Sequence, residues 1–366
     1  MALSHCWGRS NLPLTNTKNK AQRLRGIALG EMSRSFADAI TVARSFGVRY
    51  VWIDSLCIVQ DDAEDWDAEA AKMHLVYSNS FLTISATGAK DGTFGCLGPR
   101  APREYARLPH TDKSGTRGEL YAFGLSAEKE AKKANYIDMV AEPLSSRGWC
   151  FQERVLSRRT LHFASDQMYF ECMEGFQSED GLRLPSRYFT MHGSRALQHV
   201  PGLGNSPNST SHLEQWYQIL WSYGSRMLTK GSDKLPALGG IAAMFAERLD
   251  DQYLAGHWRK SLVEELLWQA LKVTDVEEDR TVPSWSWAAI NGIPASGGLA
   301  GRWEPLACVL DCHVELGGKS VVKKTLLVRL RFCTACPRSR VRTGGFGLNL
   351  NPRLPHVFAT KAIATR

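Results

Sequence analysis

A charged residue lies inside an otherwise apolar stretch in the first part of this 366-residue chain. Asp54 stands in the run YVWIDSLCI, residues 50–58. Burying a carboxylate there is costly unless it is paired or has a function, so Asp54 is a candidate catalytic or orienting acid. Ser55 follows it directly and is expected to line the same pocket. The alternative is that Asp54 caps a turn or pairs with an arginine.

A second set of polar and aromatic side chains ends the first expected strand. His5, Cys6 and Trp7 follow the short apolar start of the chain and precede Gly8. Ligands of parallel sheets lie beyond the carboxyl ends of the strands, so we expect these three residues to line the pocket near Asp54. His5 is not expected to activate Cys6, because neighbours on a strand point to opposite faces.

Glu69 is the other candidate carboxylate. A helix is expected from Asp61 or Asp62 onward, and Trp66 on it is expected to line the pocket. Glu69 lies one helical turn after Trp66, early enough to face the same edge. The competing interpretation is a solvated charge on the helix surface, which is common for a glutamate.

The elements expected around these residues alternate between strand and helix. Strand patterns cover residues 2–7, 50–58 and 81–86, and helical spacing covers 33–46 and the stretch after 62. This alternation predicts an α/β fold with a parallel sheet flanked by helices. Residues 88–140 are turn-rich and charged, as in an insertion.

The rest of the chain has a different pattern. Paired strands are expected at 160–163 and 167–172. Residues 161–210 are therefore expected to form a β-hairpin region followed by a linker, 181–210, that is rich in Pro, Gly and Ser. Residues 211–315 are expected to be helical first and β-structured afterwards, a mixed α+β region.

The net charge of +8 is concentrated at one end. Residues 316–366 hold eleven Lys or Arg and no Asp or Glu, whereas the preceding residues hold 34 basic and 37 acidic side chains. The body is therefore slightly acidic, and we expect no nucleic-acid partner for it. The last segment is interpreted as a basic, poorly ordered tail.

The nine cysteines indicate reduced thiols. Their number is odd, no signal peptide is recognised, and no apolar run is long enough to span a bilayer, so we expect a cytoplasmic protein. Two pairs, Cys308 with Cys312 and Cys333 with Cys336, offer four thiolates for a structural zinc. Their spacing favours buried or free thiols instead, and we expect no metal and no bound cofactor.

Several ordered blocks resemble the fungal heterokaryon incompatibility (HET) domain. They are LSHCWG (3–8), YVWIDSLCIVQDD (50–62), Asp65 with Trp66, residues 72–77, and RGWCFQER (147–154) with 157–159. Segments resembling the region that follows this domain continue to about Gly292. In the family a strand usually precedes the first block, so the domain, taken as residues 1–160, is expected to begin mid-strand.

The resemblance implies an effector of fungal nonself recognition that triggers growth arrest or programmed cell death. HET domains are thought to be distant relatives of TIR domains, some of which cleave NAD at its nicotinamide–ribose bond. TIR enzymes place a Trp shortly before their catalytic Glu, and Trp66 with Glu69 is similar with one residue fewer. By this resemblance Glu69 is the catalytic carboxylate, Asp54 orients or assists it, and NAD is the substrate.

Two other functions remain open. The first is a non-catalytic signalling module that associates with itself or with other incompatibility proteins. The second is a HET-like protein recruited to a secondary-metabolite pathway, where the aromatic-rich second half would bind a small apolar substrate.

Overall fold

The computed structural model describes residues 1–8, 12–100, 105–122, 139–184, 212–276, 282–283, 285–295, 307–315 and 325–332. The chain divides into two compact units, Met1–Asp250 and Asp251–Arg366. The predicted domain boundaries stay predictions, and the Pro-rich linker after residue 184 lies outside the described residues, as do Cys333, Cys336 and most of the basic segment.

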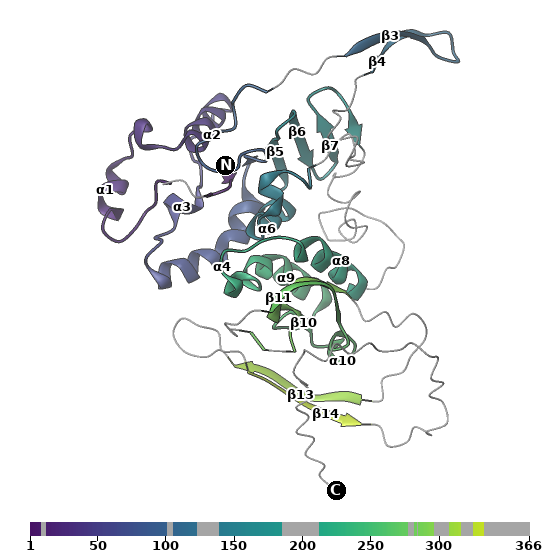
Figure 1. The fold of residues 1–366 in the computed structure, drawn as a ribbon. Coiled ribbons are helices and arrows are strands. Elements are labelled where there is room, and N and C mark those ends of the chain that lie inside the picture. Colours follow the sequence, from purple (N-terminus) through teal and green to yellow (C-terminus); the bar gives the residue numbers. More distant parts are fainter. Residues whose placement is uncertain are drawn as a thin grey trace. The chain divides into compact units, whose positions relative to one another are not determined.

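A six-stranded sheet forms the centre of the first unit (Figure 1). Its strands are, in spatial order, β1 (Ala2–Ser4), β2 (Thr83–Ser85), β5 (Arg159–Phe163), β6 (Met168–Cys172), β7 (Gly175–Ser178) and β8 (Arg183–Leu184). The pairs β1–β2 and β2–β5 are parallel, and the later pairs are antiparallel. The predicted α/β class is confirmed, with a mixed sheet flanked by helices. The predicted pairing of residues 160–163 with 167–172 is confirmed by β5 and β6.

Helices surround this sheet. They are α1 (Lys20–Arg25), η1 (Leu29–Glu31), α2 (Arg34–Ser45), α3 (Asp54–Cys57), α4 (Ala63–Asn79), η2 (Pro143–Ser146), α6 (Trp149–Leu156), α8 (His212–Gly224), η4 (Gly231–Asp233) and α9 (Pro236–Leu249). Local capping explains where two of them begin. The Ser33 side chain accepts from the backbone of Phe36 at the start of α2, and Asp62 accepts from two backbone N–H groups at the start of α4. Both helix starts were expected from the sequence.

The strand expected at residues 50–58 is largely wrong. Only Trp52 joins the sheet, through a single parallel bridge to Ala2, and Asp54 begins the short helix α3. Asp54 Oδ1 accepts from the Ser55 backbone at 2.7 Å, and Cys57 N donates to Ile53 O at 2.8 Å. These local hydrogen bonds replace ladder bonds to a neighbouring strand, as Asp side chains often do.

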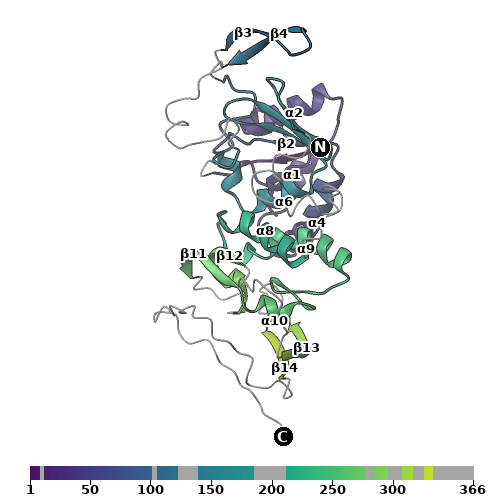
Figure 2. The same ribbon diagram turned by 90° about the vertical axis from the view of Figure 1, so that its right-hand side faces the viewer.

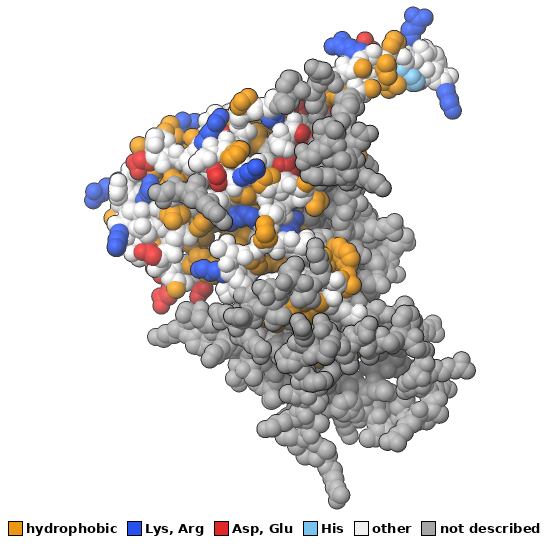
Figure 3. All heavy atoms as spheres, in the orientation of Figure 1, with side chains coloured by type: hydrophobic (Ala, Val, Ile, Leu, Met, Phe, Trp, Pro, Cys, Tyr) orange, Lys and Arg blue, Asp and Glu red, His pale blue; other side chains and the backbone are white. Residues whose placement is uncertain are grey.

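An antiparallel hairpin lies within the expected insertion. Its strands are β3 (Ala106–Thr111) and β4 (Arg117–Ala122), and every residue of both is exposed. In Figure 3 this hairpin carries several basic side chains, while hydrophobic and charged side chains alternate over the described surface of the first unit.

The second unit contains short antiparallel pairs. Its elements are β9 (Tyr253–Leu254), β10 (His257–Trp258), α10 (Leu262–Glu265), β11 (Gln269–Val276), η5 (Trp287–Ala289), β12 (Ile290–Ala295), β13 (Ala307–Glu315) and β14 (Thr325–Phe332). The mixed helical and β character expected for this region is present. Cys308 and Cys312 lie on β13, in the strand-like run expected there. Across the residues that the model describes, no helix is long and apolar enough to cross a membrane.

Helix α9 approaches α4 and α6 closely, side by side with them in Figures 1 and 2. Gly240 permits this contact, because a Cβ there would lie 2.3 Å from His74 Cβ and 2.8 Å from Gln152 Oε1. Its backbone N–H also donates to Gln152 Oε1 at 2.7 Å. At the neighbouring Gly239 a Cβ would meet nothing within 4 Å.

We therefore expect Gly240→Ala and Gly239→Ala to have opposite effects. Overpacking at Gly240 should lower the free energy of unfolding by about 1–3 kcal/mol. The same change at Gly239 should raise it by up to about 1 kcal/mol, because alanine is the better helix former. Urea unfolding of both variants measures the difference, and equal effects at the two positions would contradict the close packing.

Candidate functional site

The end of β1 and the start of α3 bring three of the expected residues together. Trp7 Nε1 donates to Asp54 Oδ2 at 2.8 Å, and His5 Nδ1 lies 3.7 Å from Asp54 Oδ1. The bridge between Ala2 and Trp52 holds the two segments in parallel, so residues that follow them meet at one edge. The Asp54 side chain is 17% exposed to solvent. A ligand at this edge can therefore reach its carboxylate.

His5 is buried beside Asp54 as a neutral imidazole. Burial lowers its pKa, and the positive charge of Arg147 acts in the same direction, while Asp54 partly counters them. Its Nε2 atom is buried and has no hydrogen-bond partner among the described residues. His5 therefore adds no positive charge beside Asp54 at neutral pH.

Cys6 and Ser55 lie on the buried side of this edge. Cys6 packs with Leu144 and Cys150, and burial raises the pKa of its thiol to about 11. The thiol is therefore protonated at neutral pH and a poor nucleophile. Ser55 is fully buried, and its hydroxyl has no hydrogen-bond partner in the described part of the chain.

Glu69 and Trp66 lie on α4, outside that set of contacts. Glu69 pairs with Lys72 at 2.9 Å, and 29% of its side chain is exposed. Trp66 packs edge-on against Trp149 with ring centroids 6.1 Å apart. Within the described ranges no hydrogen bond or ion pair joins Glu69 to Asp54. Both carboxylates nevertheless lie near Cys57, since the charges of both raise the pKa of its thiol in addition to burial.

A buried carboxyl behind Asp54 was not identified from the sequence. Glu153 on α6 is 4% exposed, and its pKa is raised to about 7, first by burial and then by the charge of Asp54. Hydrogen bonds with the hydroxyls of Ser4 and Tyr77 and the charge of Arg147 partly counter this rise in pKa. A buried carboxyl whose pKa is raised in this way is a recurrent feature of acid–base sites.

Arg147 connects this carboxyl to β1. Its guanidinium donates to the backbone carbonyl of His5, and its charge influences the pKa values of His5, Cys6 and Glu153. Arg147 and Glu153 both lie in the block RGWCFQER, which supported the resemblance without an assigned chemistry. In the sequence, Glu153 is marked by being a charged residue among the apolar residues Cys150, Phe151 and Val155, which are all buried on α6.

A comparison with protein families identifies the segment of the chain that contains this site. Residues 1–153 match the family model described as Heterokaryon incompatibility protein (HET). The matched segment, called the HET region below, extends from β1 to Glu153 and includes every residue of the site. No curated protein and no solved structure matches the chain. The resemblance noted in the sequence is thus confirmed for these residues.

A second buried polar cluster holds the end of α6, just beyond the HET region, against the sheet. Glu171 on β6 accepts from Arg154 Nε at 3.0 Å and lies 3.1 Å from His162 Nε2. His162 Nδ1 lies 3.1 Å from the Thr87 hydroxyl. The order of acid, imidazole and hydroxyl resembles a proton relay, but Glu171, His162 and Thr87 are all at most 2% exposed. Their burial indicates a structural role, in which Arg154 neutralises Glu171.

The chemistry available at the strand edge is that of a carboxylate. Asp54 is oriented by Trp7, lies next to a neutral imidazole and has a second carboxyl behind it. A carboxylate in this position can stabilise a positively charged sugar-like transition state. The residues that the model describes contain no group of three or more His, Cys, Asp or Glu side chains able to hold a metal ion.

Proposed function

We propose that the HET region is an effector of heterokaryon incompatibility that acts in fungal nonself recognition and programmed cell death by hydrolysing NAD. The observation that carries this proposal is the partly exposed Asp54 at the strand edge, which accepts from Trp7 Nε1 at 2.8 Å and lies beside His5. NAD is the substrate and not a resident cofactor. Activation would follow self-association or contact with other incompatibility proteins.

The proposed reaction breaks the bond between ribose C1′ and the nicotinamide nitrogen. Nicotinamide leaves as a neutral molecule with the electron pair of that bond, and the ribose carbon becomes an oxocarbenium-like cation. The carboxylate of Asp54 stabilises this positive charge. Water then adds to C1′ and gives up a proton, so that the products are ADP-ribose, nicotinamide and one proton.

Glu69 is the second carboxylate proposed for this reaction, on the strength of the likeness to TIR enzymes. Its present partner Lys72 does not prevent the role, because the pair is solvent-exposed, with Lys72 58% exposed. Exposed pairs of this kind contribute only about 0–1 kcal/mol, so a bound substrate can displace Lys72. The two acids are distinguishable by mutation.

We expect Asp54→Asn and Glu69→Gln each to reduce nicotinamide release by the purified 366-residue chain about a hundredfold or more. Glu64→Gln is the matched control, since Glu64 is an exposed acid in the first turn of the same helix as Glu69. Each variant is also expressed in yeast and scored for growth arrest and cellular NAD.

The wild-type chain and Glu64→Gln should deplete NAD and stop growth, while Asp54→Asn should do neither. Growth arrest by the wild-type chain with unchanged NAD would overturn the hydrolase and favour the oligomerising signalling module. Full activity of Asp54→Asn with loss in Glu69→Gln would transfer the central role to Glu69.

A further inference from the structure

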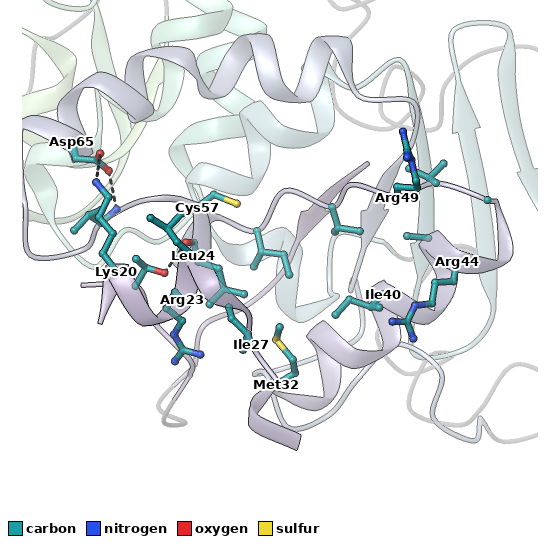
Figure 4. A pocket seen from close by; sticks show the side chains of 18 residues that line it. Lys20, Arg23, Leu24, Ile27, Met32, Ile40, Arg44, Arg49, Cys57 and Asp65 are labelled. Carbon is teal, nitrogen blue, oxygen red and sulfur yellow. Dashed lines mark hydrogen bonds and ion pairs between the residues drawn. The ribbon is translucent and has the colours of Figure 1, made fainter. Parts of the chain in front are cut away.

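A pocket of about 900 Å³ opens between α1, α2 and residues 47–59 (Figure 4). Its volume falls within the roughly 300–1,000 Å³ of small-molecule sites. The lining shares no residue with the Asp54 and Glu153 cluster and reaches α3 from Ile53, Leu56 and Cys57. The proposed hydrolysis makes no use of this pocket.

The middle of the pocket is apolar. Met32, Ile40, Val51 and Leu56 line it, and each is only partly buried. Helix α1 buries none of its own residues, and Leu24 on it is 81% exposed. A ligand can therefore enter beside α1 and cover apolar side chains that now contact water.

Cationic side chains lie at both ends of the pocket, but acids balance only one end. Lys20 lies 3.9 Å from Asp65, and Arg23 lies 3.4 Å from Glu31. At the other end, Figure 4 shows Arg44 and Arg49.

Neither Arg44 nor Arg49 has an acidic partner within the described residues. The guanidinium carbon of Arg49 lies 5.6 Å from the centre of the Tyr50 ring, which is uncharged. The two arginines therefore form an unneutralised cationic end next to the apolar wall.

We propose that this pocket binds a small amphipathic carboxylate. Its apolar body lies along Ile40, Met32 and Leu56. Its carboxylate accepts two hydrogen bonds from Arg44, which follows Ile40 by one turn of α2, and Arg49 adds positive charge at the same end. The planar guanidinium suits a carboxylate because it donates two parallel N–H groups. The acids at the opposite end, Asp65 and Glu31, disfavour a second negative charge, so the ligand is a monoanion and not a polyphosphate.

The test titrates the full-length chain with octanoate and with 1-octanol by calorimetry. Both probes share the apolar body, and only octanoate carries the charge. The wild-type chain should bind octanoate at least about tenfold more tightly than octanol, as expected for charge-assisted hydrogen bonds to the arginines. Equal affinities, or no binding of octanoate up to millimolar concentrations, would overturn the proposal without any variant.

The double variant Arg44→Gln/Arg49→Gln should lose the preference for octanoate and keep the affinity for octanol. Arg107→Gln/Arg117→Gln on the exposed β3–β4 hairpin removes the same charge elsewhere and should leave both affinities unchanged. Ile40→Trp fills the pocket and should weaken both probes. All three variants replace exposed or partly exposed side chains, and thermal unfolding confirms that they fold.

Anionic phosphatidylserine vesicles separate a free ligand from a membrane surface. Because the proposed ligand is free in solution, we expect that these vesicles neither bind the chain through Arg44 and Arg49 nor compete with octanoate. Vesicle binding that is lost in the arginine double variant, together with no octanoate binding, would overturn the pocket and assign the two arginines to a lipid surface.

Discussion

Replacing Arg154 by Met is expected to lower the free energy of unfolding by about 3–5 kcal/mol, the usual effect of leaving one partner of a buried ion pair alone. The carboxylate of Glu171 has a fully buried side chain, and Arg154 Nε donates to it at 3.0 Å. His162 Nε2 lies 3.1 Å from the same oxygen and is buried as well. Without Arg154 the negative charge of Glu171 lies beside His162, whose imidazole must take up a proton to neutralise it.

Urea unfolding at pH 7 measures this effect, and two further variants isolate its cause. Arg158→Met changes an exposed arginine of the same segment and should alter stability by less than about 0.5 kcal/mol. The double variant Arg154→Met/Glu171→Met removes both charges and should recover part of the loss. A loss below about 1 kcal/mol in Arg154→Met would mean that water or another cation reaches Glu171.

The contribution of Glu153 to the stability of the chain is expected to fall by up to about 3 kcal/mol as pH rises from about 5 to about 8. Burial and the charge of Asp54 raise the pKa of Glu153 from 4.5 to about 7. The folded chain therefore binds the proton more tightly than the unfolded chain. The resulting stabilisation is complete below the unfolded pKa, is lost as pH rises through about 7, and stays lost above it.

Glu153→Gln should remove this component, since an amide does not titrate. The measurement is the free energy of unfolding at several pH values between 5 and 8 for the wild-type chain, Glu153→Gln and Glu174→Gln, an exposed control. The difference between wild type and Glu153→Gln should change with pH, and that between wild type and the control should not. A wild-type curve parallel to that of Glu153→Gln would show that Glu153 is ionised in the folded chain throughout.

The same result bears on the proposed reaction. If Glu153 titrates near pH 7, its charge next to Asp54 changes within the range in which the hydrolase is assayed. Nicotinamide release can then be compared with the stability curve at matched pH values. The two measurements are independent, because stability depends on the free chain and release depends on bound NAD.

Much of the architecture was predictable because it depends on neighbours in the chain. Helices α2 and α4 begin where Ser33 and Asp62 accept from backbone N–H groups two or three residues later, and such caps are visible in the sequence. Strands β2, β5 and β6 correspond to apolar or alternating runs, and the HET blocks are contiguous. The one local error, the strand at 50–58, arose where the Asp54 side chain bonds its own backbone and turns the chain into α3.

The candidate site depended on tertiary structure. The spacing of residues identified Asp54, His5 and Trp7, but only the bridge of Trp52 to Ala2 brings Asp54 to the end of β1. Glu153 is a candidate because α6 packs behind that edge. Its pKa is raised by burial and by the charge of Asp54, which is almost a hundred residues away in the chain. Local sequence therefore determined the α/β elements and the match of residues 1–153 to the HET family model, because caps and apolar spacing act over a few residues. The pairing of distant carboxyls was decided by packing, because desolvation and charge act through space.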